Sequence, residues 1–361
     1  MDKISYIKNL VLAWYEQNKR TLPWREDPHP YKIWLSEIIL QQTRVAQGLP
    51  YFQRFIAAFP TIEHLAKADE ESVLKLWQGL GYYSRARNLH HTAIEIHQNR
   101  NNQFPVTFTE LIKLKGVGEY TAAAIASIAF HEPVPVIDGN VYRVLSRLFN
   151  IDLPIDSSEG KKMFKSLAQE LLHTEKPGEY NQAIMEFGAL QCVPVNPDCQ
   201  ACPLLELCEA YHNNTIDTRP IKRGKTIVEK RWHYYFVLTD QQHVYIDKRP
   251  NKGIWGGMYQ FPLEETKTPL APDQLSELSL WNRLYQPHFD LQIIQNKKKH
   301  LLSHRQIHAT YILLISKDKL SDTIHPFQLK PTKELSKLPV SKLMDSFLTN
   351  YYESIFENRS R

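Results

Sequence analysis

The sequence of 361 residues lacks any uninterrupted apolar run of the roughly 18 residues that a membrane-spanning helix needs. Its first 17 residues carry charged side chains through a helical pattern instead of bounding an apolar segment, so we expect no secretory signal. Internal repeats and long low-complexity tracts are also lacking, and 42% hydrophobic with 23% charged residues is typical of globular proteins. We therefore expect a cytoplasmic protein without a membrane partner.

Cysteine is almost absent, because the chain has four and all of them fall in the 17-residue window 192–208. Such clustering argues against a framework of disulfides and favours a metal site. The gaps of six, two and five residues suit the four thiolate ligands of a [4Fe-4S] cluster. The alternative is a zinc site, which usually uses two close pairs of cysteines. The expected ligands are Cys192, Cys199, Cys202 and Cys208.

The length predicts two domains, each able to bury its own core. Apolar residues recur at helical spacing up to about residue 210, which predicts a helical domain over 1–212. Residues 213–230 are rich in cations and turn formers and are expected to form a basic linker. Short β-rich runs then predict an α+β domain over 231–361. The net charge of +5 is compatible with a nucleic-acid partner but decides little.

A short glycine-containing turn joins two expected helices at about 110–130. Gly116 and Gly118 let the backbone approach a ligand, and the free N–H groups of the helix that follows can bind a phosphate. An ordinary connection between helices would show the same pattern.

Two acids stand in unusual positions. Glu37 shares a helical face with mostly apolar residues, and such surroundings favour a protonated carboxyl. Asp138 stands at the head of an amphipathic helix, where its role could simply be that of an N-cap.

These motifs together resemble a known family of DNA repair enzymes. The cysteine spacing and the stretch Leu114 to Ala123 resemble the endonuclease III superfamily, which has a helix-hairpin-helix and an iron-sulfur loop. The stretch from Leu22 to Thr43 closely resembles adenine DNA glycosylases of the MutY family. The resemblance implies an all-α glycosylase domain with a [4Fe-4S] loop at 192–208.

The resemblance also implies roles for single residues. Glu37 is expected to protonate adenine, and Asp138 to stabilise the positive charge that develops on the sugar. An enzyme acting on a stacked base must extrude it and fill the gap. Gln42 and Tyr82 match positions that enter the duplex, and Asn140 matches a supporting DNA contact. Arg25 and Gln182 match residues lining the adenine pocket.

One position differs from endonuclease III-like lyases. Those relatives carry a nucleophilic lysine two residues after the second hairpin glycine, where this chain has Tyr120. Without an amine no Schiff base with the sugar can form, so water must complete the reaction. We therefore expect a monofunctional glycosylase with Tyr120 beside the reacting sugar.

The stretch from Trp255 to Pro262 resembles the start of the C-terminal domain of MutY proteins, a relative of the Nudix hydrolases. The acid cluster that a Nudix hydrolase needs to hold Mg²⁺ is lacking after Gly257, so the domain is expected to bind without hydrolysing. Leu302, Ser303 and His304 match a Phe-Ser-His loop that recognises 8-oxoguanine. Leu302 departs from the aromatic residue of that loop.

The sequence thus predicts a monomeric adenine DNA glycosylase acting on duplex DNA with adenine:8-oxoguanine or adenine:guanine mispairs. One alternative is an endonuclease III-type lyase for oxidised pyrimidines, which Tyr120 and the extra domain disfavour. The other is a non-catalytic DNA-binding module, which Glu37 and Asp138 disfavour.

Overall fold

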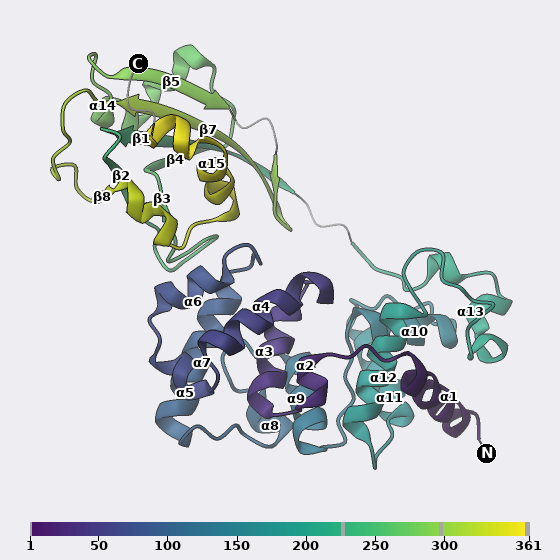
Figure 1. The fold of residues 1–361 in the computed structure, drawn as a ribbon. Coiled ribbons are helices and arrows are strands. Elements are labelled where there is room, and N and C mark those ends of the chain that lie inside the picture. Colours follow the sequence, from purple (N-terminus) through teal and green to yellow (C-terminus); the bar gives the residue numbers. More distant parts are fainter. Residues whose placement is uncertain (1, 225–227, 296–298, 358–361) are drawn as a thin grey trace. The chain divides into compact units, whose positions relative to one another are not determined.

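The computed structural model describes residues 2–224, 228–295 and 299–357 (Figure 1). Residues 225–227 of the expected linker lie outside the described residues, as do 296–298 and 358–361 of the expected second domain and Met1. Two compact units are present. The first comprises Met1–Lys67 with Asn88–Gly224, and the second comprises Ala68–Arg87 with Lys225–Arg361. The sequence does not indicate that residues 68–87 belong with the second unit.

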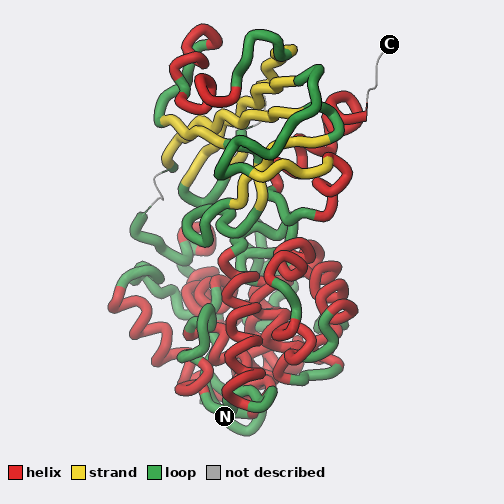
Figure 2. Tube along the Cα trace, turned by 90° about the vertical axis from the view of Figure 1, so that its left-hand side faces the viewer, coloured by secondary structure: helices red, strands yellow, loops and turns green. Residues whose placement is uncertain are grey.

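The first unit is built from helices, as the colouring of Figure 2 shows. Ser, Asp and Pro at several helix starts supply the caps and fixed backbone angles that such starts need. One helix, α7, runs from the second unit into the first. The α-helices are α1 (Lys3–Asn18), α2 (Pro23–Glu26), α3 (Pro30–Leu40), α4 (Val45–Ala58), α5 (Ile62–Lys67), α7 (Ser84–Arg100), α8 (Phe108–Leu111), α9 (Glu119–Phe130), α10 (Gly139–Leu148), α11 (Ser158–Leu171), α12 (Pro177–Leu190) and α13 (Glu209–His212). Two short 3-10 turns, η1 (Leu205–Leu207) and η2 (Ile216–Thr218), follow α12 and α13.

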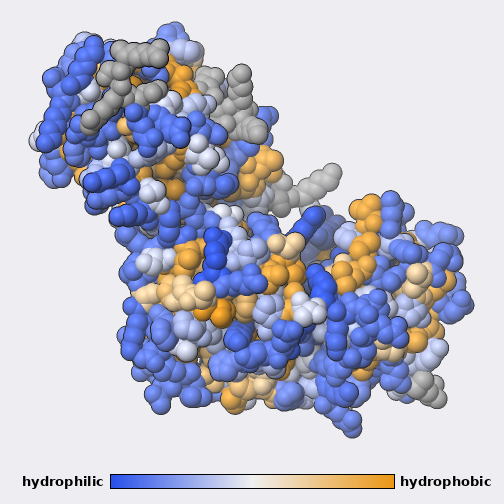
Figure 3. Space-filling view, viewed as in Figure 1, coloured by the Kyte–Doolittle hydropathy of each residue, from blue (hydrophilic) through white to orange (hydrophobic). Residues whose placement is uncertain are grey.

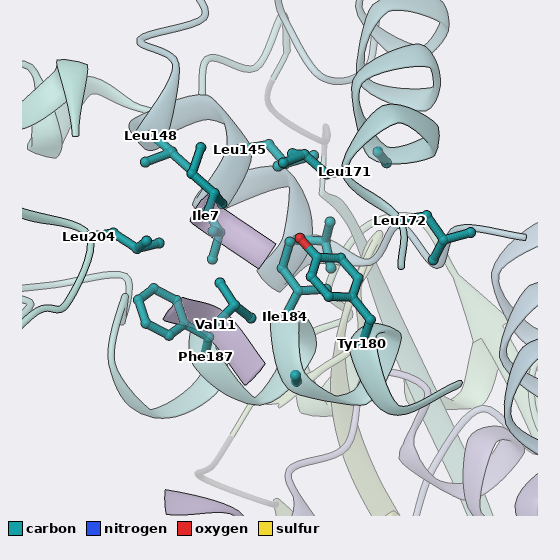
Figure 4. Close-up of a cluster of buried hydrophobic side chains, with 14 of the residues drawn as sticks. Ile7, Val11, Leu145, Leu148, Leu171, Leu172, Tyr180, Ile184, Phe187 and Leu204 are labelled. Carbon is teal, nitrogen blue, oxygen red and sulfur yellow. The ribbon is translucent and has the colours of Figure 1, made fainter. Parts of the chain in front are cut away.

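One core of this unit forms where α1, α10, α11 and α12 meet (Figure 4). Each helix buries residues three or four positions apart, such as Ile7 and Val11 of α1 and Leu145 and Leu148 of α10. Leu204, from the segment that carries the cysteines, also packs into this core. The cysteine segment is therefore anchored to the helices that carry Asp138 and Gln182.

Close contact between α12 and α9 fixes the chain that leads to Asp138. A Cβ added to Gly178 would lie 2.5 Å from the Ser127 carbonyl oxygen. Buried Asn181 donates to Ser127 Oγ at 2.9 Å and to the Val134 carbonyl at 2.8 Å, and its Oδ1 accepts from the Val136 N–H at 3.1 Å. Because buried polar groups need partners, this arrangement fixes the relative position of all three segments.

The second unit contains a mixed sheet and short helices. Its strands are β1 (Glu229–Thr239), β2 (His243–Lys248), β3 (Tyr259–Gln260), β4 (Leu263–Thr266), β5 (Asp290–Gln295), β6 (His300–Leu301), β7 (Arg305–Ile315) and β8 (Gln328–Pro331). Its helices are α6 (Glu70–Trp77), α14 (Ser279–Leu284) and α15 (Lys342–Tyr352), with 3-10 turns η3 (Pro272–Glu277) and η4 (Thr332–Lys337) and the π-turn η5 (Glu353–Glu357).

Strands β1 and β7 run parallel at the centre of the sheet, and the other pairings are antiparallel. Alternate residues point to opposite faces because a strand has a period of two. Phe236 and Ile312 pack on one face with Leu275, Leu278 and Leu284 from η3 and α14. On the other face, Tyr235 stacks on Tyr311, which stacks on Phe347 of α15 at 3.8 Å between ring centroids. The expected all-α part followed by an α+β part is confirmed.

Hydrophilic residues predominate on the face of the protein shown in Figure 3, and apolar residues lie between them in small groups. Among the described residues, no helix is both long and apolar enough to cross a membrane.

The close contact at Gly178 predicts an effect on stability. Gly178→Ala should lower the free energy of unfolding by about 1–3 kcal/mol, because its methyl group would press on backbone atoms of α9. Chemical denaturation followed by circular dichroism measures the change. Gly139→Ala is the matched control, since a Cβ at this helical glycine would meet nothing within 4 Å. Equal midpoints for the two variants would show that α9 and α12 are not in contact at this point.

Candidate active site

A cavity of about 740 Å³ in the first unit gathers most of the residues singled out in the sequence. Glu37 comes from α3, Tyr120 from the first turn of α9, and Asp138 from the residue before α10. Four more predicted residues line the same cavity: Arg25, Gln42, Asn140 and Gln182. Residues separated by more than 150 positions in the sequence therefore meet at one site.

Glu37 is buried, with 8% of its surface exposed. Its Oε2 accepts a hydrogen bond of 2.5 Å from the hydroxyl of Tyr120. Burial raises the pKa of Glu37 to about 7, with the nearby charge of Asp138 acting in the same direction and the Tyr120 bond and Arg25 opposing it. A carboxyl with this pKa can hold a proton near neutral pH and donate it.

Asp138 is the N-cap of α10, as the simpler interpretation of its sequence position required. Its Oδ1 accepts from the N–H groups of Asn140 and Val141 at 2.9 and 2.8 Å, and its Oδ2 accepts from Asn140 Nδ2 at 2.7 Å. Burial raises the pKa of Asp138, while these hydrogen bonds oppose the rise. Asp138 nevertheless also lines the cavity with Glu37, so capping and a place in the site coexist.

Tyr120 connects the helix-hairpin-helix to the acid. Its hydroxyl lies between Glu37 and the sulfur of Met185, which is 3.6 Å away. Burial and the two nearby carboxyls raise the pKa of Tyr120 well above its usual value, so the hydroxyl stays protonated and keeps donating to Glu37.

Two cavity residues that the sequence interpretation overlooked, Arg20 and Glu186, form an ion cluster with Arg25, and a third, Arg143, contacts Asn140. Glu186 of α12 pairs with Arg20 at 2.6 Å and with Arg25 at 2.8 Å, and Arg143 donates to Asn140 Oδ1 at 2.9 Å. The signal for Glu186 is present in the sequence, because it is an acid among buried α12 residues. The same criterion singled out Glu37 in α3.

The four cysteines line one small cavity of about 30 Å³, and none is in a disulfide. No set of three or more His, Cys, Asp or Glu side chains in the described part of the chain converges on one metal ion. Single-ion zinc sites place every sulfur about 2.3 Å from one point, whereas a four-iron cluster holds its thiolates farther apart. The four thiols that gather at this cavity are the donor set that a [4Fe-4S] cluster uses.

The hairpin of the first unit leads into a helix start that has no side-chain cap. Gly116 has a φ of 79°, and a Cβ there would lie 2.7 Å from Asn88 Cβ, so glycine is required at this position. Helix α9 begins after Gly118, and no side chain caps its first N–H groups. A helix start of this kind is available to an anion such as a phosphate.

The remaining predicted residues lie in the second unit, where Tyr82, Ser303 and His304 line a cavity of about 570 Å³ together with Trp255. The Leu302 N–H donates to the Arg305 carbonyl at 2.7 Å, which closes a turn between β6 and β7. Ser303 and His304 are exposed at its tip.

Comparison with known proteins places this geometry in a family. Residues 35–172 match the model of the HhH-GPD superfamily of base excision DNA repair proteins, and residues 233–350 match a NUDIX domain. An adenine DNA glycosylase of Buchnera aphidicola from Acyrthosiphon pisum is 30% identical over 95% of this chain and 98% of that relative. The chain belongs to the adenine DNA glycosylase family. It is an adenine DNA glycosylase of base excision repair, as the sequence predicted.

Other relatives agree. The adenine DNA glycosylase of Buchnera aphidicola from Schizaphis graminum is 38% identical over 73% of this chain and 76% of the relative. The human adenine DNA glycosylase is 42% identical over 58% of this chain and 40% of the relative.

The fold comparison covers the helical part. A thermostable thymine-DNA glycosylase superposes with a TM-score of 0.54 at 26% identity, over 58% of this chain and 97% of that structure. An endonuclease III structure shows the same fold, with a TM-score of 0.50 at 23% identity, over 59% of this chain and 99% of that structure.

The raised pKa of Glu37 predicts the pH dependence of base release. The acid form is populated below about pH 7, so the single-turnover rate should fall about tenfold per pH unit well above it.

The substitution Glu37→Gln retains the shape of the side chain and should lose about 10² to 10⁴-fold in rate while still binding duplex. A wild-type rate independent of pH from about 6 to 9, or a variant rate near wild type, would remove Glu37 as the proton donor.

Proposed function

We propose that the enzyme removes adenine opposite 8-oxoguanine or guanine by acid-catalysed hydrolysis of the N-glycosidic bond. The observation that carries the proposal is the buried Glu37 carboxyl, hydrogen-bonded to Tyr120 and sharing one cavity with Asp138. A base-release assay on an adenine:8-oxoguanine duplex tests it.

The chemistry divides between the two acids. Adenine leaves readily once a ring nitrogen is protonated, and Glu37 supplies that proton. The electrons of the glycosidic bond then go to the departing base, and positive charge develops on the sugar. Ionised Asp138 stabilises this charge, and its three N–H donors favour the ionised form. Water adds to the sugar, and its proton passes to the Glu37 carboxylate, which restores the acid.

The substrate base must leave the duplex before this chemistry begins. The cavity that holds Glu37 would receive it, with Arg25 and Gln182 lining the pocket. We assign to Gln42, Asn140 and the hairpin around Gly116 and Gly118 the contacts that hold the strand, and to Tyr82 insertion into the stack. Support comes from the exposure of Gln42 and Tyr82 and from the uncapped start of α9.

A [4Fe-4S] cluster bound by the four cysteines belongs to the same proposal. Cys192, Cys199, Cys202 and Cys208 would hold it, and its role would be to tie the segment after α12 into one body. The chain itself supports the segment through Arg147, a buried side chain that donates to the Val193 and Pro194 carbonyls at 2.7 and 3.0 Å.

The chain has Tyr120 where the lyases carry a lysine, so the reaction should proceed by hydrolysis without a covalent amine intermediate. Substitution of Tyr120 can test whether this residue lies beside the sugar. Tyr120→Lys should introduce an amine beside the sugar and allow borohydride trapping of the enzyme on an adenine:8-oxoguanine duplex. The neighbouring carboxyls favour the ammonium form, so trapping should be slow. Wild type is the control. A folded variant that excises adenine but traps no more than wild type would contradict the placement, and strong trapping by wild type would contradict the monofunctional assignment.

Recognition of 8-oxoguanine by the second unit is tested best by one substitution. Deleting residues 231–361 would strip α6 of partners such as Lys248 and Tyr259, which both contact Glu71, so the deletion is a poor test. Ser303→Ala should lower the ratio of excision opposite 8-oxoguanine to excision opposite guanine by about tenfold, through loss of one hydrogen bond. Ser336→Ala, an exposed serine elsewhere in this unit, is the control. Equal losses opposite both bases would deny Ser303 a role in recognition.

A further inference from the structure

Glu186 is an enclosed carboxylate in the wall of the cavity that holds Glu37, with 2% of its side chain exposed. Its Oε1 accepts from the Arg20 N–H at 3.1 Å, Arg20 Nε at 2.7 Å and Arg25 Nη1 at 3.0 Å. Its Oε2 accepts from Arg20 Nη2 at 2.6 Å and Arg25 Nη2 at 2.8 Å. One carboxylate thus satisfies two guanidinium groups, a geometry that fixes their direction as well as their charge.

These bonds hold Arg25 in place. Arg25 lies in the single-turn helix α2, and its Nη1 also donates to the Arg20 carbonyl at 3.0 Å. The guanidinium also lies 5.6 Å from the centre of the Tyr15 ring of α1. Burial alone would raise the pKa of Glu186, but the bonds from Arg20 and Arg25 lower it to about 2, so Glu186 stays ionised.

The charges of this ion cluster are therefore compensated in part. Arg20 and Arg25 carry +2 and Glu186 carries −1, which leaves +1. The groups facing Glu37 are Tyr120 from α9, Asp138 from the start of α10 and Arg25 from α2. Arg25 is the cation of this set, and an uncompensated cation favours the carboxylate form of a neighbouring acid.

We propose that Glu186 is a positioning residue of the excision reaction, which holds Arg25 in the cavity wall and cancels one positive charge there, so that Glu37 keeps its proton. The inference rests on the proposed role of Glu37 as the proton donor. Glu186 itself touches no reacting atom and acts through Arg25.

Removing the negative charge should therefore change the pH dependence of excision. In Glu186→Gln the cluster charge rises from +1 to +2, and the carboxylate form of Glu37 becomes more favourable. The descending limb of the pH–rate profile should move to lower pH by about half to one unit, so the rate at about pH 8 falls roughly three- to tenfold. Lowering the pH should restore the rate, which a merely structural defect would not allow.

The experiment measures single-turnover release of adenine opposite 8-oxoguanine by the full chain from about pH 5 to about pH 9. Glu179→Gln is the matched control, because it makes the same change in the same helix at a partly exposed residue paired with Lys176. The double variant Arg20→Gln/Glu186→Gln restores the cluster charge to +1. It leaves one guanidinium group without the Glu186 carboxylate, whereas Glu186→Gln leaves two. This double variant also tests the proposal if Glu186→Gln alone fails to fold.

For Glu186→Gln we expect a descending limb of the pH–rate profile that is displaced to lower pH, and for Glu179→Gln we expect the limb of wild type. For the double variant we expect a limb within a few tenths of a pH unit of wild type. A Glu186→Gln limb coincident with wild type overturns the proposal, whatever happens to the maximal rate. A double variant whose descending limb is displaced as far as that of Glu186→Gln also overturns the proposal. If only the double variant folds, a descending limb that does not coincide with that of wild type overturns it as well. Failure of the proton-donor role is distinguishable, because wild type would then show no descending limb near pH 7.

Discussion

Keeping a proton on a buried carboxyl that lies beside a second carboxyl is the constraint on which the active site depends. Burial disfavours the charged form of Glu37, and the negative charge of Asp138 disfavours it further. The hydroxyl of Tyr120 and the cation of Arg25 act in the opposite direction. The result is an acid near pH 7, where small changes in charge or geometry have large effects on the protonated fraction. Such balance requires a rigid surrounding.

The helical scaffold provides this rigidity through contacts that leave little freedom. Glycine at 178 lets α12 approach the α9 backbone, and Asn181 binds both α9 and the chain before Asp138. The same two helices carry Tyr120 and Gln182. A shift of one helix would therefore move Tyr120, Asp138 and Gln182 together.

The sequence predicts much of this arrangement because its strongest signals are local. An acid on an apolar helical face, four clustered cysteines and a glycine turn between helices can each be recognised within about 20 residues. The roles of two features escaped prediction because they depend on contacts between distant segments, although Glu186 itself stands out as an acid among apolar residues of α12. Glu186 is meaningful only when α12 meets Arg20 and Arg25, and residues 68–87 join the second unit through partners more than 150 positions away. Strand β1 also begins at Glu229, inside the expected linker.

The fold gives the two acids different hydrogen-bond donors. Asp138 is the residue directly before α10. The free N–H groups at the start of that helix therefore point at its carboxylate and favour the charged form. Glu37 lies within α3, where the backbone donors are already used by the helix, and it receives one hydroxyl bond instead. The hydrogen bonds supplied by the fold therefore favour the ionised form more strongly at Asp138 than at Glu37, where burial raises the pKa to about 7. The N-cap position of Asp138, which as a sequence feature suggests a structural role, thus also supplies the hydrogen bonds that oppose the rise in its pKa caused by burial.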